Sequence, residues 1–328
     1  MARVVRFHEL GGPEVLRVDQ VEVGAPGPGE ARLRVAAIGL NRVEAMFRSG
    51  GFGAPPLPAK IGYEAAGVIE ALGEGVEGFK VGDRVATLPG LPMERYGVYG
   101  EAILYPADWL IPQPEGLSLQ DAAAAWMQYL TAYALIALAE LKPDDAVVIT
   151  AASSSVGLAA IQIANMLGAR SIAVTRGRGK AAALKAHGAS DVVVTDEQDL
   201  VQAVTALTGG RGARVIFDAV AGDTIAALAE IASTRGIIIV YGALAGGLGA
   251  MPLQTAMLKS LTIRGYAMND LMADPEVRRA AIDFITAGLV SGELKPVIDQ
   301  VFPLEEIAAA HRRLESNLQF GKILVSVP

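Results

Sequence analysis

The sequence predicts an α/β protein that combines a doubly wound parallel (Rossmann) sheet with a second, mostly β domain. In the middle of the chain, short and continuously apolar runs alternate with alanine-rich helical stretches. This pattern is typical of parallel strands that are buried on both faces and joined by crossover helices. Residues 1–120 instead combine short strands with turns rich in glycine and proline, which is typical of a compact β domain.

Length, composition and charge limit the function. The chain has 328 residues, of which 52% are hydrophobic, and no cysteine. It can therefore bury a core in two domains but cannot form disulfides or cysteine-ligated zinc. The formal net charge of −7 and the lack of a basic run argue against nucleic-acid binding. No apolar run has the roughly 20 residues of a membrane span and no signal-peptide core is found, so we expect a cytoplasmic protein.

The expected elements follow in order along the chain. In the first domain, strands are expected over residues 31–40 and 63–72, between the turn segments PGPGE, GEGVEGFKVGD and PGLP. In the second, the helical stretches VGLAAIQIANMLGA, GKAAALKAHGA and DLVQAVTALTGG each end at glycine, the usual left-handed residue after a helix. The apolar runs that predict its strands are 146–150, 171–174, 191–194, 214–220 and 236–242.

The segment AASSSVG (151–157) joins the first of these apolar runs to a helix, as a dinucleotide-binding turn does. Aligned with G-x-G-x-x-G, Ala152 and Ser154 stand at the first two glycine positions and Gly157 at the third. Gly157 allows close packing of helix and strand, and the serine hydroxyls add donors for a diphosphate at the helix N-terminus. A plain turn with serine as the N-cap explains the same residues.

The segment AVTRGRGK (173–180) bears on the choice of cofactor. An NAD-specific sheet places Asp or Glu about 20 residues past the phosphate turn, to bind the ribose 2′-hydroxyl. Here Arg176, Arg178 and Lys180 lie close together, and no acid follows until Asp191. Cations at a helix start oppose the helix dipole, which disfavours a plain solvated cluster. The segment therefore predicts NADPH, whose 2′-phosphate such cations bind.

A set of motifs in fixed order resembles the zinc-independent quinone oxidoreductases of the medium-chain dehydrogenase/reductase superfamily. The motifs are FHELGGPEVL, GLNRVEAMFRSG, GYEAAGVIEALGEGVEGFKVGDRV, AAWMQYLTAY, AASSSVGLAAIQIA and FGKILVSV. The resemblance implies a partly barrel-like (GroES-like) catalytic domain interrupted by the cofactor domain. The implied ranges are 1–120 and 270–328 for the catalytic domain and 121–269 for the Rossmann domain.

The resemblance also implies that the site has no metal. Zinc-dependent relatives carry Cys and His in the stretches where this chain has Asn41 and Tyr63, and its only histidines are His8, His187 and His311. For these three histidines, a structural or surface role is expected. Glu64 is expected beside the position that the metal takes in those relatives.

The implied activity is hydride transfer from NADPH to a quinone or an α,β-unsaturated carbonyl compound. A stand-alone enoyl reductase and a non-catalytic, crystallin-like NADPH-binding protein remain as alternatives. Asn41 can donate a hydrogen bond to a substrate carbonyl or a ribose hydroxyl, or only cap a turn. Tyr63 can supply a proton or only form a wall, and Thr131 can bind near the nicotinamide amide or only satisfy its helix.

Further residues and one partner follow from the same resemblance. A homodimer is expected, formed through the segments GIIIVYGALAGG and LTIRGYAM. Trp126, Tyr129 and Tyr96 are candidates to frame a flat substrate, although large aromatic side chains also build cores. The residues expected to contact the cofactor are Asn41, Thr131, Ser154, Ser155, Val156, Gly157, Thr175, Arg176, Lys180, Gly242, Ala243 and Asn317.

Overall fold

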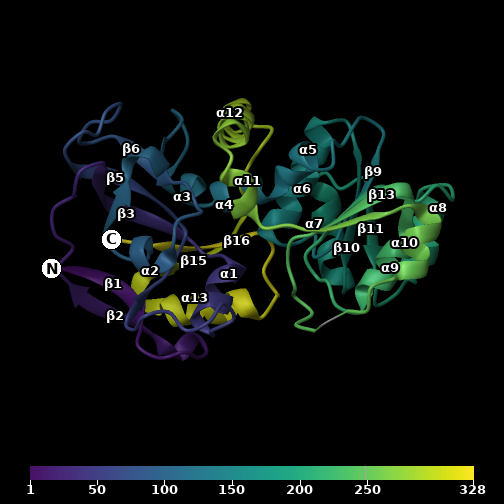
Figure 1. Cartoon of the computed structure of the whole chain (residues 1–328), viewed down its shortest axis with the longest axis horizontal. Coiled ribbons are helices and arrows are strands. Elements are labelled where there is room, and N and C mark those ends of the chain that lie inside the picture. The colour runs from purple at the N-terminus through teal and green to yellow at the C-terminus, as the bar shows by residue number, and fades with distance from the viewer. Residues whose placement is uncertain (248) are drawn as a thin grey trace. The chain divides into compact units, whose positions relative to one another are not determined.

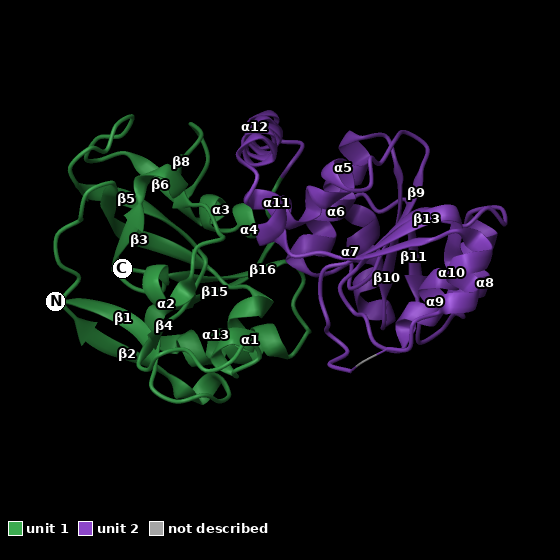
Figure 2. Ribbon diagram, in the orientation of Figure 1, with its two compact units in different colours: residues 1–127, 295–328 green, residues 128–294 purple. Residues whose placement is uncertain are grey.

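The structure, a computed structural model, describes residues 1–247 and 249–328. The chain divides into two compact units, coloured separately in Figure 2. Unit 1 comprises Met1–Met127 and Lys295–Pro328, and unit 2 comprises Gln128–Leu294. Unit 2 is therefore an insertion in the sequence of unit 1.

Unit 2 is built on a six-stranded parallel sheet with the strand order β11-β10-β9-β12-β13-β14. Figure 1 labels β9, β10, β11 and β13 of this sheet. The chain runs outward from β9 in both directions, which is the Rossmann arrangement, and its right-handed crossovers put helices on both faces. Each predicted apolar run forms a strand. The strands are β9 (Ala146–Ile149), β10 (Arg170–Thr175), β11 (Asp191–Val194), β12 (Ala213–Asp218), β13 (Ala232–Val240) and β14 (Thr262–Gly265).

The helices of unit 2 end where the sequence predicts. Gly168 and Gly188, which follow α6 and α7, have φ of 70° and 96°, the left-handed conformation that closes a helix. No helix in the described part of the chain is long and apolar enough to cross a membrane. The helices are α5 (Ala134–Ala137), α6 (Ser155–Met166), α7 (Ala181–Ala186), α8 (Leu200–Leu207), α9 (Thr224–Ile231), α10 (Leu253–Lys259), α11 (Met268–Met272) and α12 (Pro275–Ser291), with the 3-10 turn η3 (Arg178–Lys180).

Unit 1 contains a seven-stranded sheet in the order β15-β16-β3-β5-β6-β8, with β7 also paired to β3, and a three-stranded sheet β2-β1-β4. The C-terminal strand β16 pairs with β3 of the N-terminal segment, so the end of the chain returns to the first domain as the resemblance implies. The strands are β1 (Ala2–Phe7), β2 (Leu16–Val21), β3 (Glu30–Gly39), β4 (Ala59–Lys60), β5 (Glu64–Leu72), β6 (Arg84–Thr87), β7 (Ala102–Pro106), β8 (Leu110–Pro112), β15 (Ile298–Pro303) and β16 (Lys322–Ser326).

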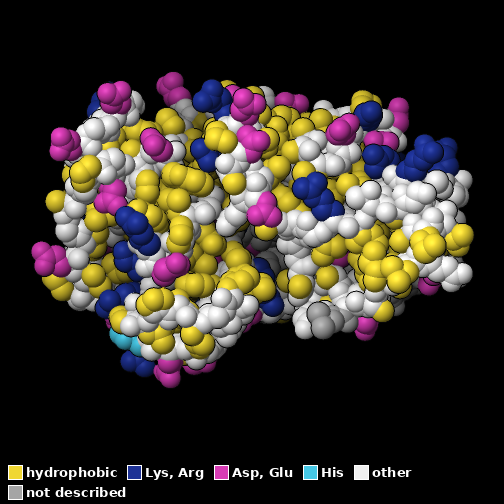
Figure 3. All heavy atoms as spheres, in the orientation of Figure 1, with side chains coloured by type: hydrophobic (Ala, Val, Ile, Leu, Met, Phe, Trp, Pro, Cys, Tyr) yellow, Lys and Arg dark blue, Asp and Glu magenta, His cyan; other side chains and the backbone are white. Residues whose placement is uncertain are grey.

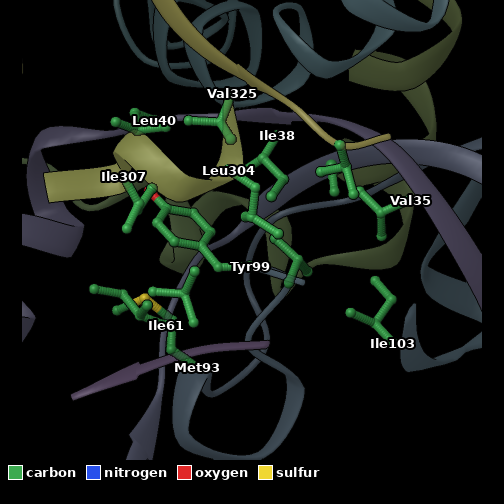
Figure 4. Packing of buried hydrophobic residues seen from close by; sticks show 14 of the residues in the cluster. Val35, Ile38, Leu40, Ile61, Met93, Tyr99, Ile103, Leu304, Ile307 and Val325 are labelled. Carbon is green, nitrogen blue, oxygen red and sulfur yellow. The ribbon is translucent and has the colours of Figure 1, made fainter. Parts of the chain in front are cut away.

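The core of unit 1 joins both segments of the chain. Figure 4 shows Val35 and Tyr99 from the N-terminal segment packed with Leu304, Ile307 and Val325 from the C-terminal one. All are buried, so the two segments fold as one body. The helices and 3-10 turns here are η1 (Pro13–Val15), α1 (Arg42–Arg48), α2 (Met93–Tyr96), η2 (Ala107–Trp109), α3 (Leu119–Ala123), η4 (Leu304–Glu306) and α13 (Ile307–Glu315), and α4 (Trp126–Ala132) spans the end of unit 1 and the start of unit 2.

The boundaries of the units differ from the predicted ones, which follow residues 120 and 269. Residues 121–127 belong to unit 1, because α3 packs on β3 and β5 and the Met127 N–H donates to Glu64 at 3.1 Å. Residues 270–294 belong to unit 2, where the ring of Phe284 lies 5.8 Å from that of Tyr133. These helix contacts leave no mark in the sequence pattern.

Candidate active site

The turn between β9 and α6 is built from small residues. Ser154 is the N-cap of α6, and its Oγ accepts a hydrogen bond from the Gly157 N–H at 3.1 Å. A Cβ at Gly157 would lie 2.6 Å from the backbone of Ala152, so only glycine allows this approach of helix and turn. Ser155 and Val156 form the first helical turn, whose N–H groups have no acceptor within the helix. The capping role of Ser154 is thus observed, and diphosphate binding stays a prediction.

The basic residues after β10 have different surroundings. The Lys180 Nζ donates to the Ser153 Oγ at 3.0 Å, which ties the cation to the phosphate turn. Arg178 is exposed and pairs with Glu197 through two bonds of 2.7 and 2.6 Å. Arg176 is exposed and forms no ion pair within the described residues. Thr175, the last residue of β10, is buried.

Glu197 lies beyond Asp191, the first acid that follows these cations in the sequence. Because β10 and β11 are adjacent parallel strands, the segments that follow them meet at one edge of the sheet. Glu197 thereby neutralises Arg178, whereas Arg176 has no ion-pair partner among the described residues.

A second polar cluster lies at the end of β12. The carboxylate of Asp218 is buried and accepts hydrogen bonds from the Thr150 Oγ1 at 2.6 Å and from the N–H of Val220 at 3.0 Å. Gly242 and Ala243 follow β13, the neighbouring strand, after one intervening residue, Tyr241. The cluster ties the residue after β9 to the loop after β12, and neither Thr150 nor Asp218 carries a signal in the sequence.

In unit 1 the side chain of Asn41 is committed to partners within the protein. Its Oδ1 accepts a hydrogen bond from the Lys322 Nζ at 2.6 Å. Its Nδ2 donates to the Gly39 carbonyl at 3.1 Å and to the Glu44 Oε1 at 3.2 Å. Asn41 is 7% exposed. Both N–H groups of the amide already donate hydrogen bonds within the protein. The donor role expected for Asn41 would therefore require one of these hydrogen bonds to break.

Asn41 and Tyr63 meet at one carboxylate. The Asn41 N–H donates to the Glu44 Oε2 at 2.7 Å, and the Tyr63 N–H donates to the Glu44 Oε1 at 2.9 Å. Asn41 precedes α1 and Glu44 lies in its first turn, which makes this carboxylate part of the helix cap. The two predicted catalytic residues are therefore neighbours, held by a glutamate that the sequence argument did not include.

The carboxylate of Glu44 belongs to a longer buried network. The Tyr99 hydroxyl donates to the Glu44 Oε2 at 2.5 Å, and Arg48 donates to the His311 Nδ1 at 2.9 Å. Since a guanidinium can only donate, the His311 Nδ1 accepts and its Nε2 carries the proton toward the Tyr99 oxygen, 3.3 Å away. Burial raises the pKa of Glu44 and, with the nearby Glu44 charge, that of Tyr99. Burial and then the Arg48 charge lower the pKa of His311 to about 3.

The aromatic candidates divide into core and partly exposed residues. Trp126 and Tyr129 are fully buried, and the Tyr129 hydroxyl donates to Gln162, so both pack in the interior rather than frame a substrate. Tyr63 and Tyr96 are partly buried and pack against the core of unit 1. This packing suits the role of Tyr63 as a wall.

Two further residues that are predicted to contact the cofactor, Thr131 and Asn317, lie in or next to a helix. Thr131 is buried in α4. Asn317 follows α13 with a left-handed φ of 57°, and its Oδ1 accepts a hydrogen bond from Arg42 at 3.2 Å. No group of three or more His, Cys, Asp or Glu side chains in residues 1–247 and 249–328 is arranged to hold a metal ion.

Comparisons with known proteins agree with this architecture. A family model described as alcohol dehydrogenase GroES-like domain matches residues 27–115, and one described as zinc-binding dehydrogenase matches residues 155–287. A quinone oxidoreductase from Pseudomonas aeruginosa is 33% identical over 327 residues, which is 99% of each chain. The chain belongs to the quinone oxidoreductase family of the medium-chain dehydrogenase/reductase superfamily.

Other members of this superfamily are also similar over their whole length. A 2-haloacrylate reductase from a Burkholderia species is 33% identical over 344 residues, covering 99% of this chain and 98% of its own. The structure of Escherichia coli quinone oxidoreductase complexed with NADPH matches 99% of this chain and 100% of that one, with 31% identity and a TM-score of 0.91. A structure described as an NAD-dependent alcohol dehydrogenase matches 100% of both chains, with 35% identity and a TM-score of 0.93.

Proposed function

We propose that this protein uses NADPH to reduce a quinone or an α,β-unsaturated carbonyl compound, without a metal. The observation that carries the proposal is the cation pair after β10, where Lys180 is tied to the phosphate turn and Arg176 has no ion-pair partner in the described chain. The full-length similarity to quinone oxidoreductases and to a 2-haloacrylate reductase supports both substrate classes.

The residues of unit 2 suit a phosphorylated dinucleotide. The N–H groups of Ser155 and Val156 favour a diphosphate, because they have no acceptor within the helix and lie at its positive end. Lys180 and Arg176 suit the 2′-phosphate, which an acidic residue would repel. NADPH supplies the hydride from C4 of its dihydronicotinamide ring. The protein must bind it, hold the acceptor in line and manage the charge that appears on oxygen.

Asn41 would contribute to cofactor binding as an acceptor. Its two amide N–H bonds are donated to Gly39 and Glu44, while Oδ1 accepts only from Lys322 among its hydrogen bonds in the described structure. A carbonyl oxygen has two lone pairs, so one remains for a hydroxyl donor such as a ribose hydroxyl. This replaces the donor role toward a substrate carbonyl that the sequence suggests.

Tyr63 is the candidate proton donor. A reduced quinone can take its proton from water, whereas hydride addition to an enone leaves a carbon that benefits from a placed acid. Tyr63→Phe should therefore slow enone reduction more than quinone reduction. Equal small effects on both substrates would leave Tyr63 as a wall.

The decisive experiment is a screen of NADPH oxidation with quinones, alkenals and enoyl thioesters. Turnover of a quinone or an alkenal, with elemental analysis that finds no stoichiometric metal, is expected. Exclusive use of enoyl thioesters would identify the alternative enoyl reductase. Tight NADPH binding without any turnover would identify the non-catalytic alternative and refute the reductase.

The surface of unit 2 supports a homodimer. Strand β14 lies at the edge of the six-stranded sheet. The helix that precedes it in the chain, α10, contacts β13 and α9 and exposes Leu253, Met257 and Leu258. Figure 3 shows hydrophobic side chains gathered over α9 and α10. An edge strand and an apolar helix surface in the same unit are suited to association with a second copy of the chain across a two-fold axis.

A further inference from the structure

Lys322 is a buried cation that the sequence argument passed over within FGKILVSV. It is the first residue of β16 and is 1% exposed. Its Nζ lies 2.6 Å from the Glu64 Oε2 and 2.6 Å from the Asn41 Oδ1. Glu64 is fully buried as well, so this ion pair has no access to solvent.

Three strands bring this group together. Gly39, at the end of β3, pairs with Glu64 of β5 on one side and with Leu324 of β16 on the other. A Cβ at Gly39 would lie 2.8 Å from the Lys322 Cε and 2.9 Å from the Glu64 Oε2. The missing side chain of Gly39 therefore provides the space that the ion pair occupies.

The ammonium of Lys322 allows the Asn41 amide only one orientation. An ammonium group has donors and no acceptor, so it must face the Asn41 Oδ1. A flipped amide would direct its NH2 group at this cation and its oxygen at the Glu44 carboxylate and the Gly39 carbonyl. Every neighbour of the amide thus favours the same orientation, and the low polarity of the surroundings strengthens that preference.

Glu64 supplies the opposite charge that a buried ammonium needs. Its Oε2 binds Lys322, and its Oε1 accepts the N–H of Met127 in α4. Neither oxygen of Glu64 bonds to Asn41 in the described structure, so its effect on the amide passes through Lys322. Removing one partner of such a pair is strongly destabilising, whereas replacing both by uncharged groups of similar size often is not.

We propose that Lys322 is a positioning residue, which fixes the orientation of the Asn41 amide and so keeps the second lone pair of Oδ1 available to a ribose hydroxyl of NADPH, with Glu64 as its counter-ion. This inference rests on the proposed NADPH-dependent function. It assigns to the Glu64 position an electrostatic role toward Lys322 that does not depend on a metal.

The test separates positioning from stability by comparing two variants. Lys322→Met should lower the melting temperature and weaken NADPH binding about two- to tenfold, the loss of one hydrogen bond. In Lys322→Met/Glu64→Gln the unpaired carboxylate is gone and the Met127 N–H keeps an acceptor. The melting temperature should recover toward that of the wild type, while the NADPH Kd should stay at the level of the single variant.

A double-mutant cycle tests whether Lys322 acts through Asn41. The Kd of Asn41→Ala should not rise further when Lys322→Met/Glu64→Gln is added, because the group to be positioned is already absent. The stability control is Arg6→Met, which removes an ion pair with Asp19 in the same unit and should leave the NADPH Kd unchanged. Binding is followed by dinucleotide fluorescence, which does not require turnover.

Two results with the variants would overturn the proposal. Recovery of both stability and Kd in the double variant would make the ion pair purely structural, and additive effects with Asn41→Ala would show that Lys322 acts elsewhere. Wild-type protein that binds NADPH but reduces no acceptor would refute the reductase function, while the Kd comparison would still decide the role of Lys322. Wild-type protein that does not bind NADPH would overturn both.

Discussion

His311 should make the stability of unit 1 depend on pH. Its imidazole is fully buried, and its Nδ1 accepts a hydrogen bond from the Arg48 guanidinium at 2.9 Å. Protonation of His311 would place a second positive charge beside the Arg48 guanidinium in a buried site, where water cannot solvate either charge. Burial and the Arg48 charge accordingly lower the pKa of His311 from 6.5 to about 3. The perturbation is a change from pH 7.5 to roughly pH 5.0, inside the interval between these two pKa values.

The sign follows from proton linkage. The unfolded chain binds a proton at His311 below about pH 6.5, while the folded protein does not until about pH 3. The stability that neutral His311 gives is therefore complete above 6.5 and is lost progressively as the pH falls toward 3. At about pH 5 the lost free energy of unfolding is roughly 2 kcal/mol, since each unit of pKa shift corresponds to about 1.4 kcal/mol.

The assay compares the wild type with His311→Gln by urea denaturation at both pH values. Glutamine can accept from Arg48 with Oε1 and donate to Tyr99 with Nε2, but it does not titrate. The wild type should lose about 2 kcal/mol more than the variant on acidification. His187→Gln, which removes an exposed imidazole from unit 2, is the control and should retain the wild-type loss. Equal acid sensitivity of His311→Gln and the wild type would refute the reasoning.

Three further predictions concern the cofactor, the turn and the dimer. The double variant Arg176→Ala/Lys180→Ala should weaken NADPH binding about ten- to a hundredfold for each lost phosphate contact, and it should weaken NADH binding far less. Titration of the protein with each cofactor measures both effects. Arg178→Ala is the matched control with a small effect, because its guanidinium is already paired; equal losses for both cofactors would refute phosphate recognition. Gly157→Val should overpack the strand–helix turn, which lowers the free energy of unfolding by about 1–3 kcal/mol, lowers the melting temperature and weakens NADPH binding. Unchanged NADPH binding would show that this turn does not contact the cofactor. Met257 is 78% exposed, so Met257→Glu should convert a homodimer into a monomer without lowering the melting temperature of unit 2. Light scattering measures the change, and a wild-type protein that is monomeric at micromolar concentration would refute the dimer.

Sequence periodicity was sufficient to predict the sheet of unit 2. Strands buried on both faces must be continuously apolar, so the runs 146–150 and 236–242 mark β9 and β13 without any knowledge of their neighbours. The glycines at 168 and 188 likewise mark the ends of α6 and α7, because a left-handed residue is a local requirement. Properties of this kind depend on a residue and its near neighbours in the chain.

The order of motifs also predicted that the C-terminal segment returns to the first domain, which the pairing of β16 with β3 confirms. It singled out Asn41 and Tyr63 as candidate site residues but not Glu44, which accepts hydrogen bonds from both. Glu44 has the spacing of a helix-capping glutamate, and that spacing was the one signal in the sequence that could have included it.

Charge pairing was decided only by the tertiary structure. Glu197 reaches Arg178 because two parallel strands end at one edge of a sheet, and Lys322 reaches Glu64 and Asn41 because β16 lies beside β3. A lysine in FGKILVSV or a glutamate after β11 has the same local pattern whether it is solvated or buried. Local pattern determines which residues become strands, helices and caps, whereas the partner of a charge depends on strand order and burial, which bring together segments far apart in the chain.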